Sequence, residues 1–238
     1  MLNIYITSAN HKDGKTFLTS GLATTMQSLG YSTSVYKPVQ TGGLEINGFM
    51  QSPDLTLIKT LDPYINTHFS YLYKINAEPL IASEIENNQI SIETIINDYR
   101  KTLATSDCTI IDSDGGILSP LTSTMQNIDI IKILQIPTLI TVSPNENSIN
   151  STLLTINTAF EKGIEVRGVV INNITENCSK NLLTSITRVI EEYSNAKILG
   201  LIPHLDKNFV PEDLITAILN GIDIESVFNV KIEKLDFN

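Results

Sequence analysis

Residues 4–16 read IYITSANHKDGKT, and this stretch decides the fold. A short apolar run leads into a polar loop, then into Gly-Lys-Thr and a segment of helical character. This order matches a phosphate-binding loop, in which backbone amides surround phosphate while the lysine and the hydroxyl serve phosphate and Mg²⁺. The alternative is a Gly-Lys-Thr tripeptide in an ordinary turn between a strand and a helix. We predict a nucleotide site with contacts from Asn10, His11, Lys12, Asp13, Gly14, Lys15 and Thr16.

Further apolar runs follow along the chain and predict the rest of the sheet. They span Thr33–Lys37, Thr109–Asp112, Pro137–Val142, Val166–Asn172 and, more weakly, Lys197–Ile202. Unbroken apolar runs of this length are typical of strands buried on both faces of a parallel sheet. Segments with helical spacing alternate with them, at Thr16–Leu29, Ile92–Leu103, Ile149–Lys162, Lys180–Tyr193 and Pro211–Asn220.

This alternation predicts an α/β fold. We expect a three-layer domain like that of the P-loop NTPases, with a mostly parallel sheet and helices on both faces. No internal repeat, low-complexity linker or change in composition divides the chain, so residues 1–238 are expected to form a single domain.

Composition and charge limit the classes of partner and the cellular compartment that we expect for this chain. The formal net charge of −10 argues against nucleic acid or an anionic membrane as the main partner. No apolar stretch reaches the roughly 18 residues of a membrane span, and the N-terminus lacks the basic region of a signal peptide. Cys108 and Cys178 show no metal-ligand spacing, and neither do the three histidines. We expect free thiols, a cytoplasmic location and small-molecule ligands.

A second lysine follows the second predicted strand. The carboxyl ends of neighbouring parallel strands open onto one crevice, so Lys37 is expected to lie beside Lys15. Two ammonium groups near one γ-phosphate would stabilise the charge that develops during phosphoryl transfer. Lys15 and Lys37 are therefore the candidate catalytic residues. The alternative for Lys37 is a solvated lysine at the end of a strand.

Carboxylates are placed to hold a metal ion. Asp112 ends the apolar run Thr109–Asp112, an arrangement that holds Mg²⁺ directly or through water in P-loop enzymes. Thr16, Asp54 and Asp112 could suffice, because Mg²⁺ prefers oxygen ligands and keeps several waters. For Asp54 the alternative is a helix N-cap before Leu55. Gly115-Gly116 follows Asp112 and lets backbone approach a ligand closely.

Together these motifs resemble the dethiobiotin synthetase family, in order and spacing over nearly the whole chain. The more specific parts are the lysine-proline turn and the loop Gly-Gly-x-x-x-Pro-Leu. The resemblance rests on Tyr5–Thr16, Tyr36–Gly42, Ser52–Asp54, Ala77–Ala82, Asp112–Leu121, Ser148–Asn150, Gly168–Asn173 and Gly200–Pro203.

The resemblance implies a homodimeric, ATP- and Mg²⁺-dependent ligase of biotin biosynthesis that closes the ureido ring of dethiobiotin from 7,8-diaminopelargonate and CO₂. Its substrates would be small molecules only. Lys15 and Lys37 would contact carbamate and phosphate, with Thr16, Asp54 and Asp112 around Mg²⁺. The resemblance also implies that Thr41 binds the carbamate and that Asn172 and Pro203 contact the adenine. The substrate chain would pass along Gly115 and Gly116. Its carboxylate would bind at Ser148 and Asn150 of the other subunit.

Several residues depart from the family pattern. Ser8 stands where the family usually has Gly, and Asn147 also replaces a usual Gly. Residues 11–13 read His-Lys-Asp in place of the common Thr-Glu-Val, and residues 112–116 read Asp-Ser-Asp-Gly-Gly in place of Glu-Gly-Ala-Gly-Gly. Asp13 and Asp114 add negative charge near the phosphates, which is unfavourable unless Mg²⁺ or a lysine offsets it. Two alternatives stay open: a related ATP-dependent amide- or ring-forming ligase, and a non-catalytic nucleotide-binding switch.

Overall fold

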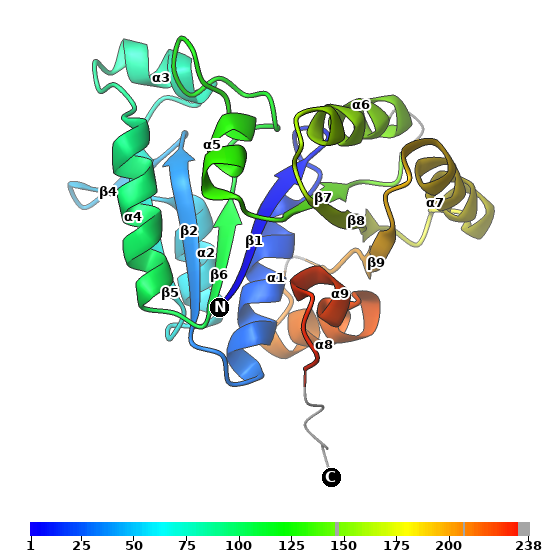
Figure 1. Cartoon of the computed structure of the whole chain (residues 1–238). Coiled ribbons are helices and arrows are strands. Elements are labelled where there is room, and N and C mark those ends of the chain that lie inside the picture. The colour runs from blue at the N-terminus through cyan, green and yellow to red at the C-terminus, as the bar shows by residue number, and fades with distance from the viewer. Residues whose placement is uncertain (146–147, 207, 233–238) are drawn as a thin grey trace.

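The computed structural model describes residues 1–145, 148–206 and 208–232. Its centre is a parallel sheet of seven strands in the order β5-β2-β6-β1-β7-β8-β9 (Figure 1). The strands are β1 Leu2–Ser8, β2 Thr33–Gln40, β5 Asn66–Leu72, β6 Cys108–Asp112, β7 Thr138–Val142, β8 Val166–Ile174 and β9 Ile198–Pro203. Every pairing within this sheet is parallel. The predicted fold class is confirmed.

Helices cover both faces of the sheet, because alternate residues of each strand are buried against opposite layers. In β1, Ile4 and Ile6 join one apolar cluster while Tyr5 belongs to another. The first cluster includes residues of α1 Lys15–Ser28, α2 Pro53–Leu61, α8 Pro211–Gly221 and α9 Ile224–Phe228. The opposite face packs against α4 Ile92–Ala104, α5 Asn127–Leu134, α6 Ser148–Glu161 and α7 Lys180–Ser194.

Some elements were not predicted from the sequence. Strand β5 reads NTHFSYL and pairs only with β2 at the edge of the sheet, so it lacks the unbroken apolar run of the central strands. A small hairpin of β3 Leu44–Ile46 and β4 Phe49–Gln51 follows β2. The short helix α3 Pro79–Ile85 and the helices α2, α5 and α9 were likewise missed.

The arrangement of strands places the site. The arrowheads of β1, β2 and β6 point in one direction in Figure 1, so their carboxyl ends lie together. Strand β1 lies between β6 and β7, and the loop from β1 to α1 emerges at that central position. Ligands of open parallel sheets bind in the crevice outside these strand ends.

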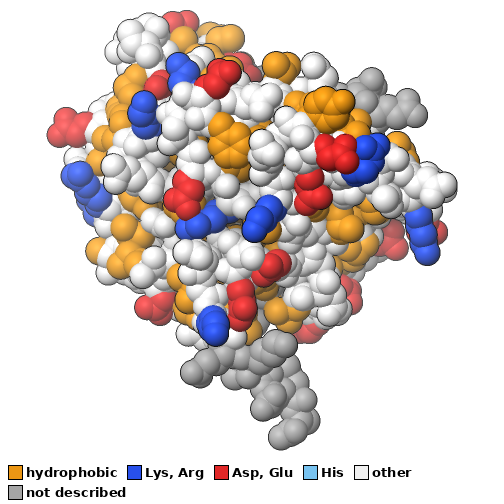
Figure 2. Space-filling model, turned by 45° about the vertical axis from the view of Figure 1, so that its right-hand side comes forward, with side chains coloured by type: hydrophobic (Ala, Val, Ile, Leu, Met, Phe, Trp, Pro, Cys, Tyr) orange, Lys and Arg blue, Asp and Glu red, His pale blue; other side chains and the backbone are white. Residues whose placement is uncertain are grey.

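On the face that Figure 2 shows, acidic and basic side chains are interspersed, so neither positive nor negative charge dominates it. Both cysteines are free, with Cys108 buried and Cys178 partly buried. Within the part of the chain that the structure describes, no helix has both the length and the apolar character needed to cross a membrane.

Candidate active site

The loop between β1 and α1 has the backbone form of a phosphate site. Gly14 is the N-cap of α1 and adopts the left-handed conformation with φ 80°. A Cβ there would collide with the side-chain amide of Asn172, so both conformation and space require glycine. The backbone N–H groups of His11, Lys12 and Gly14 donate to no other described residue. These amides and the start of α1 therefore remain available to an anion.

Lys15 lies within this loop. Its ammonium donates a hydrogen bond of 2.9 Å to the hydroxyl of Ser8, the last residue of β1. Burial lowers the pKa of Lys15, the charge of Asp112 opposes that shift, and the neighbouring charge of Lys37 adds to it. The two lysines are thus close enough to interact electrostatically, as predicted, although β6 lies between β1 and β2 in the sheet.

Asp13 serves the loop itself. Its carboxylate is buried and accepts hydrogen bonds from the backbone N–H of Asn10 at 2.8 Å and of Ser143 at 3.2 Å. Burial raises the pKa of Asp13, and these hydrogen bonds oppose the rise. Backbone amides therefore offset this charge, and so does Lys15, whose charged form the carboxylate of Asp13 favours. Asp13 therefore joins the phosphate loop to the segment that leads toward α6.

Lys37 is the centre of a buried ion cluster. Strand β2 continues to Gln40, beyond the predicted end, so Lys37 lies inside the strand and is only 2% exposed. Its ammonium is 2.6 Å from a carboxylate oxygen of Asp54 and 2.7 Å from one of Asp112. Burial alone would lower the pKa of Lys37, but the two carboxylates outweigh it and raise that pKa. The alternative of a solvated lysine is wrong.

Asp54 belongs to this cluster and is not a helix N-cap. The N-cap of α2 is Ser52, whose hydroxyl accepts the backbone N–H of Leu55 at 3.2 Å. The same hydroxyl also bonds to the side chain of Gln40. Because Ser52 caps the helix, Asp54 in the first turn is free to direct its carboxylate at Lys37.

The acidic residues fit a Mg²⁺ ion. One carboxylate oxygen of Asp112, Oδ1, is buried without a hydrogen-bond partner in the described structure. Burial raises the pKa of Asp112 while Lys37 opposes the rise, so an additional cation would suit this carboxylate. No group of three or more His, Cys, Asp or Glu side chains gathers among the described residues. An ion that keeps waters and binds substrate phosphates needs few protein ligands, so Asp54, Asp112 and Thr16 stay the candidate set.

The loop after β6 is held by hydrogen bonds to β2. The carboxylate of Asp114 accepts from the backbone N–H of Thr41 at 2.6 Å and from its hydroxyl at 2.8 Å. Thr41 therefore holds Asp114 by hydrogen bonds, and the charge of Asp114 also favours the charged forms of Lys15 and Lys37, so the lysines offset it as expected. Gly115 adopts φ 75°, and the backbone N–H of Gly116 donates to the Ser119 hydroxyl at 2.9 Å. These bonds shape a tight turn close to Thr41.

Asn172 and Pro203 lie at the ends of β8 and β9. Asn172 is buried, and its side-chain amide donates to the carbonyl of Gly14 at 3.1 Å. Asn172 therefore links the phosphate loop to strand β8. Pro203 is exposed at the end of β9, next to His204, whose ring bonds to the Asn173 side chain at 2.7 Å.

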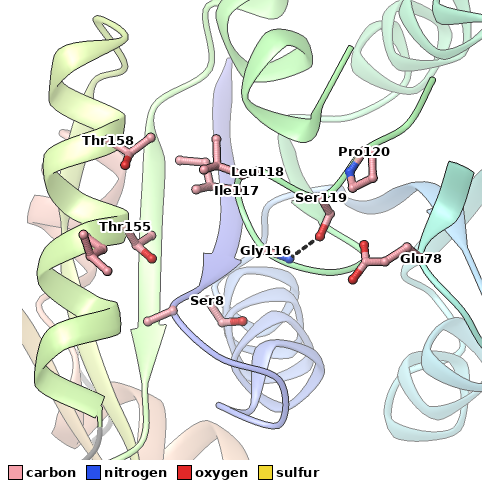
Figure 3. A pocket seen from close by; sticks show the side chains of 11 residues that line it. Ser8, Glu78, Gly116, Ile117, Leu118, Ser119, Pro120, Thr155 and Thr158 are labelled. Atoms are coloured by element: carbon pink, nitrogen blue, oxygen red, sulfur yellow. Dashed lines mark hydrogen bonds between the residues drawn. The ribbon is translucent and has the colours of Figure 1, made fainter. Parts of the chain in front are cut away.

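A pocket of about 490 Å³ opens beside the phosphate loop. Figure 3 shows Thr155 and Thr158 of α6 on one side and the turn of Gly116 and Ser119 on the other, with Ser8 at the end of β1 between them. Sequence reasoning missed the contribution of α6 and of Glu78, which also lines the pocket. The helical spacing of 155 and 158 was visible in the sequence, but nothing local pointed toward a ligand.

The helix start predicted to bind the substrate's carboxylate lies at the first turn of α6. Ser148 is buried and its hydroxyl donates to the carbonyl of Asn145 at 2.7 Å, while Asn150 is exposed. Neither residue lines the pocket of this chain. Asn147, one of the departures from the family pattern, falls outside the described residues.

Comparison with known proteins shows the family of the chain. Residues 2–209 match the model of a family described as an AAA domain. Curated relatives named ATP-dependent dethiobiotin synthetase are similar over most of their length. The protein of Clostridium novyi (strain NT) is 29% identical over 215 residues, covering 86% of this chain and 88% of the relative. The protein of Bacillus subtilis (strain 168) is 26% identical over 232 residues, covering 96% and 98%. The resemblance predicted from the sequence motifs is confirmed.

Solved structures share the fold. A ParA family ATPase from Chlorobium tepidum TLS superposes with a TM-score of 0.59 at 16% identity, covering 98% of this chain and 93% of that one. The MinD cell division protein of Aquifex aeolicus gives a TM-score of 0.53 at 17% identity, covering 91% and 87%. At these identities the likeness concerns the arrangement of the sheet and helices.

Proposed function

The chain belongs to the AAA domain family, and from that premise we propose that it is an ATP- and Mg²⁺-dependent dethiobiotin synthetase. Its substrates would be 7,8-diaminopelargonate and CO₂. The names of the curated relatives support the activity. The observation that carries the proposal is the cluster of Lys37, Asp54 and Asp112 next to Lys15 and the free amides of the phosphate loop.

The proposed reaction has three steps. One amine of the substrate attacks CO₂ and forms a carbamate, with loss of a proton. A carbamate oxygen then attacks the γ-phosphorus of ATP, and ADP leaves. Finally the second amine attacks the carbamate carbon, the bond from that carbon to the phosphorylated oxygen breaks, and inorganic phosphate leaves as the ring closes.

The protein's part in this reaction is positioning and neutralisation of charge. Lys15 and the amides of residues 11–14 would bind the β- and γ-phosphates. Lys37 would stabilise the negative charge that moves from ATP to the carbamate. When bound at Thr16, Asp54 and Asp112, Mg²⁺ would supply further neutralisation of the phosphate oxygens. To reach the phosphates, Lys15 would have to break one side-chain hydrogen bond, the one to the buried Ser8.

The rest of the site follows the same proposal. The pocket beside Gly116 would take the alkyl chain of the diamine, and Asn172 with Pro203 would border the adenine. The carboxylate of the substrate would meet Ser148 and Asn150 of a second copy, which makes the proposed enzyme a homodimer of single-domain subunits. A cytoplasmic location fits substrates that include ATP.

The test is phosphate release from ATP, Mg²⁺ and bicarbonate with and without 7,8-diaminopelargonate, with the product identified by mass. We expect diamine-dependent release and dethiobiotin. Nucleotide binding without any response to the diamine would contradict the proposal. That outcome would favour a related ligase with another substrate, or a nucleotide switch.

A further inference from the structure

Glu78 is a charged group in the pocket for which the proposed reaction has no role. Among the described residues that line the pocket, Glu78 alone carries a charge. Its carboxylate forms no hydrogen bond or ion pair with another described residue. Figure 3 shows it reaching toward Gly116 and Ser119, on the side opposite α6. Glu78 is an exposed residue, and its carboxylate, without a partner among the described residues, faces a space large enough for a substrate.

The backbone holds Glu78 in this position. A residue that precedes proline is restricted to extended conformations, and Glu78 before Pro79 has φ −55° and ψ 143°. Pro79 begins α3, and the backbone N–H of Leu80 donates to the carbonyl of Pro120 at 3.1 Å. The start of α3 is thus fastened to the same loop that forms the pocket wall. A Cβ added to Gly115 would lie 3.4 Å from a carboxylate oxygen of Glu78.

The carboxylate of Glu78 makes no hydrogen bond that would explain it as a structural group. Although Glu78 is the N-cap of α3, its side chain makes no capping hydrogen bond. A carboxylate at this position therefore contributes to the helix only the weak attraction between a negative charge and the helix N-terminus. The two lysines of the site are engaged elsewhere, Lys15 with Ser8 and Lys37 with Asp54 and Asp112. The charge of Glu78 is left to act on whatever enters the pocket.

We propose that Glu78 binds a primary ammonium group of the substrate and selects amine-bearing chains over uncharged ones. This inference rests on the proposed function and deepens it, since it gives the pocket a preference for cationic ligands. The other lining groups are apolar or hydroxyl-bearing, such as Leu154 and Thr155, and suit an alkyl chain. Ser8 lies at the pocket and touches Lys15, so a chain held at Glu78 reaches toward the phosphate site. A carboxylate and an ammonium form a charge-assisted hydrogen bond, the stronger class in proteins.

The experiment measures binding without turnover. Calorimetry at pH 7 gives the Kd of 7,8-diaminopelargonate, and of nonanoate as an amine-free chain of equal length, for the whole wild-type protein and three variants. In Glu78→Gln we expect diamine binding to weaken about tenfold or more, since a hydrogen bond between charged groups is lost. Binding of nonanoate should stay equal or tighten because a repulsive charge is removed. Glu78→Asp should fall between the wild type and Glu78→Gln.

The matched control is Glu84→Gln, an exposed glutamate of the same helix that lies outside this pocket. Its diamine Kd should equal that of the wild type. The inference is overturned if Glu78→Gln binds the diamine as the wild type does, if it loses diamine and nonanoate equally, or if the wild type has no affinity for the diamine. Failure of the proposed function is separate: there the wild type binds the diamine but forms no dethiobiotin.

Discussion

The buried charges of the site each have a partner that comes from another element. Asp13 accepts amide hydrogen bonds of its own loop and of Ser143, and Asp114 accepts two from Thr41. Lys37 shares its charge between Asp54 and Asp112. Unpaired charges in such places would be costly, because burial disfavours the ionised form. The departures from the family pattern at positions 13 and 114 are therefore compatible with a well-ordered phosphate site.

Lys37 gives the residue-scale prediction. Replacing it by alanine removes the cation that we propose stabilises the transferred phosphoryl group, so we expect turnover to fall by about 100-fold or more. Nucleotide affinity should change little, because the amides of the loop and Lys15 remain. Steady-state phosphate release together with a nucleotide titration measures both quantities.

Lys59→Ala is the control for this variant. Lys59 is an exposed lysine of α2 whose ammonium bonds only to the carbonyl of Pro63. Its turnover should equal that of the wild type. An unchanged rate in Lys37→Ala would show that Lys37 serves the structure alone.

At the scale of elements, a polar network fastens α4 to the edge of the sheet. The carboxylate of Asp98 accepts the hydroxyl of Ser70 at 2.8 Å and the ammonium of Lys101 at 3.0 Å. Ser70 lies on β5 and also bonds to the hydroxyl of Tyr36 on β2 at 2.7 Å. The network thus joins the edge strand β5, which lacks an apolar run of its own, to its neighbour and to a helix.

Asp98→Asn tests this network through the pH dependence of stability. Burial raises the pKa of Asp98, but the hydrogen bonds from Lys101 and Ser70 outweigh it, and the net effect is a lowered pKa. A lowered folded-state pKa means that the ionised carboxylate stabilises the fold above its unfolded pKa of about 3.9. This stabilisation is lost as the pH falls through the folded-state pKa. We expect Asp98→Asn to lower the free energy of unfolding by about 1 kcal/mol at pH 7.

Urea denaturation at several pH values measures the effect. The difference between the wild type and Asp98→Asn should shrink as the pH falls below about 4. Glu93→Gln, an exposed change on the same helix, should alter the free energy of unfolding by about 0.5 kcal/mol or less. A deficit of Asp98→Asn that stays constant down to the lowest pH would argue against the ionised network.

At the scale of the whole molecule, an acidic protein holds two lysines at its phosphate site. The net charge is −10, yet Lys15, Lys37 and the start of α1 converge where β1 and β2 end. Because Asp54 and Asp112 balance Lys37, the groups that favour an anion there are Lys15, the loop amides and the start of α1. Their short distances to the ligand outweigh the more distant surface charges. The net charge of the whole chain therefore does not predict whether phosphate binds at this site.

Ligand binding should report on the whole fold. A ligand that binds only the folded state stabilises it by about 2.7 kcal/mol at a concentration 100 times its Kd. We expect ATP with Mg²⁺ to raise the Tm of the wild type, and Lys15→Ala to remove most of that shift. Thermal denaturation with and without nucleotide measures it.

Lys180→Ala, an exposed change at the start of α7, serves as the comparison and should keep the full shift. If Lys15→Ala also keeps it, the loop at residues 10–16 is not the nucleotide site.

The sequence by itself determined the central strands, the long helices and the phosphate loop. Their signals are local. An unbroken apolar run, helical spacing and the glycine before Lys15 each involve residues that are close together in the sequence. The edge strand β5 and the hairpin of β3 and β4 carry no such signal, because they are not buried on both faces.

Only the tertiary structure decided which charges meet. The sequence placed Lys37, Asp54 and Asp112 near strand ends or helix starts, but Lys37 had a solvated alternative and Asp54 a capping alternative. Their contacts join three elements far apart in the chain, and burial makes the pairing of such charges obligatory. The same holds for Asp13 with Ser143 and for Glu78, whose place in the pocket depends on how α3 is fastened to the loop at Pro120.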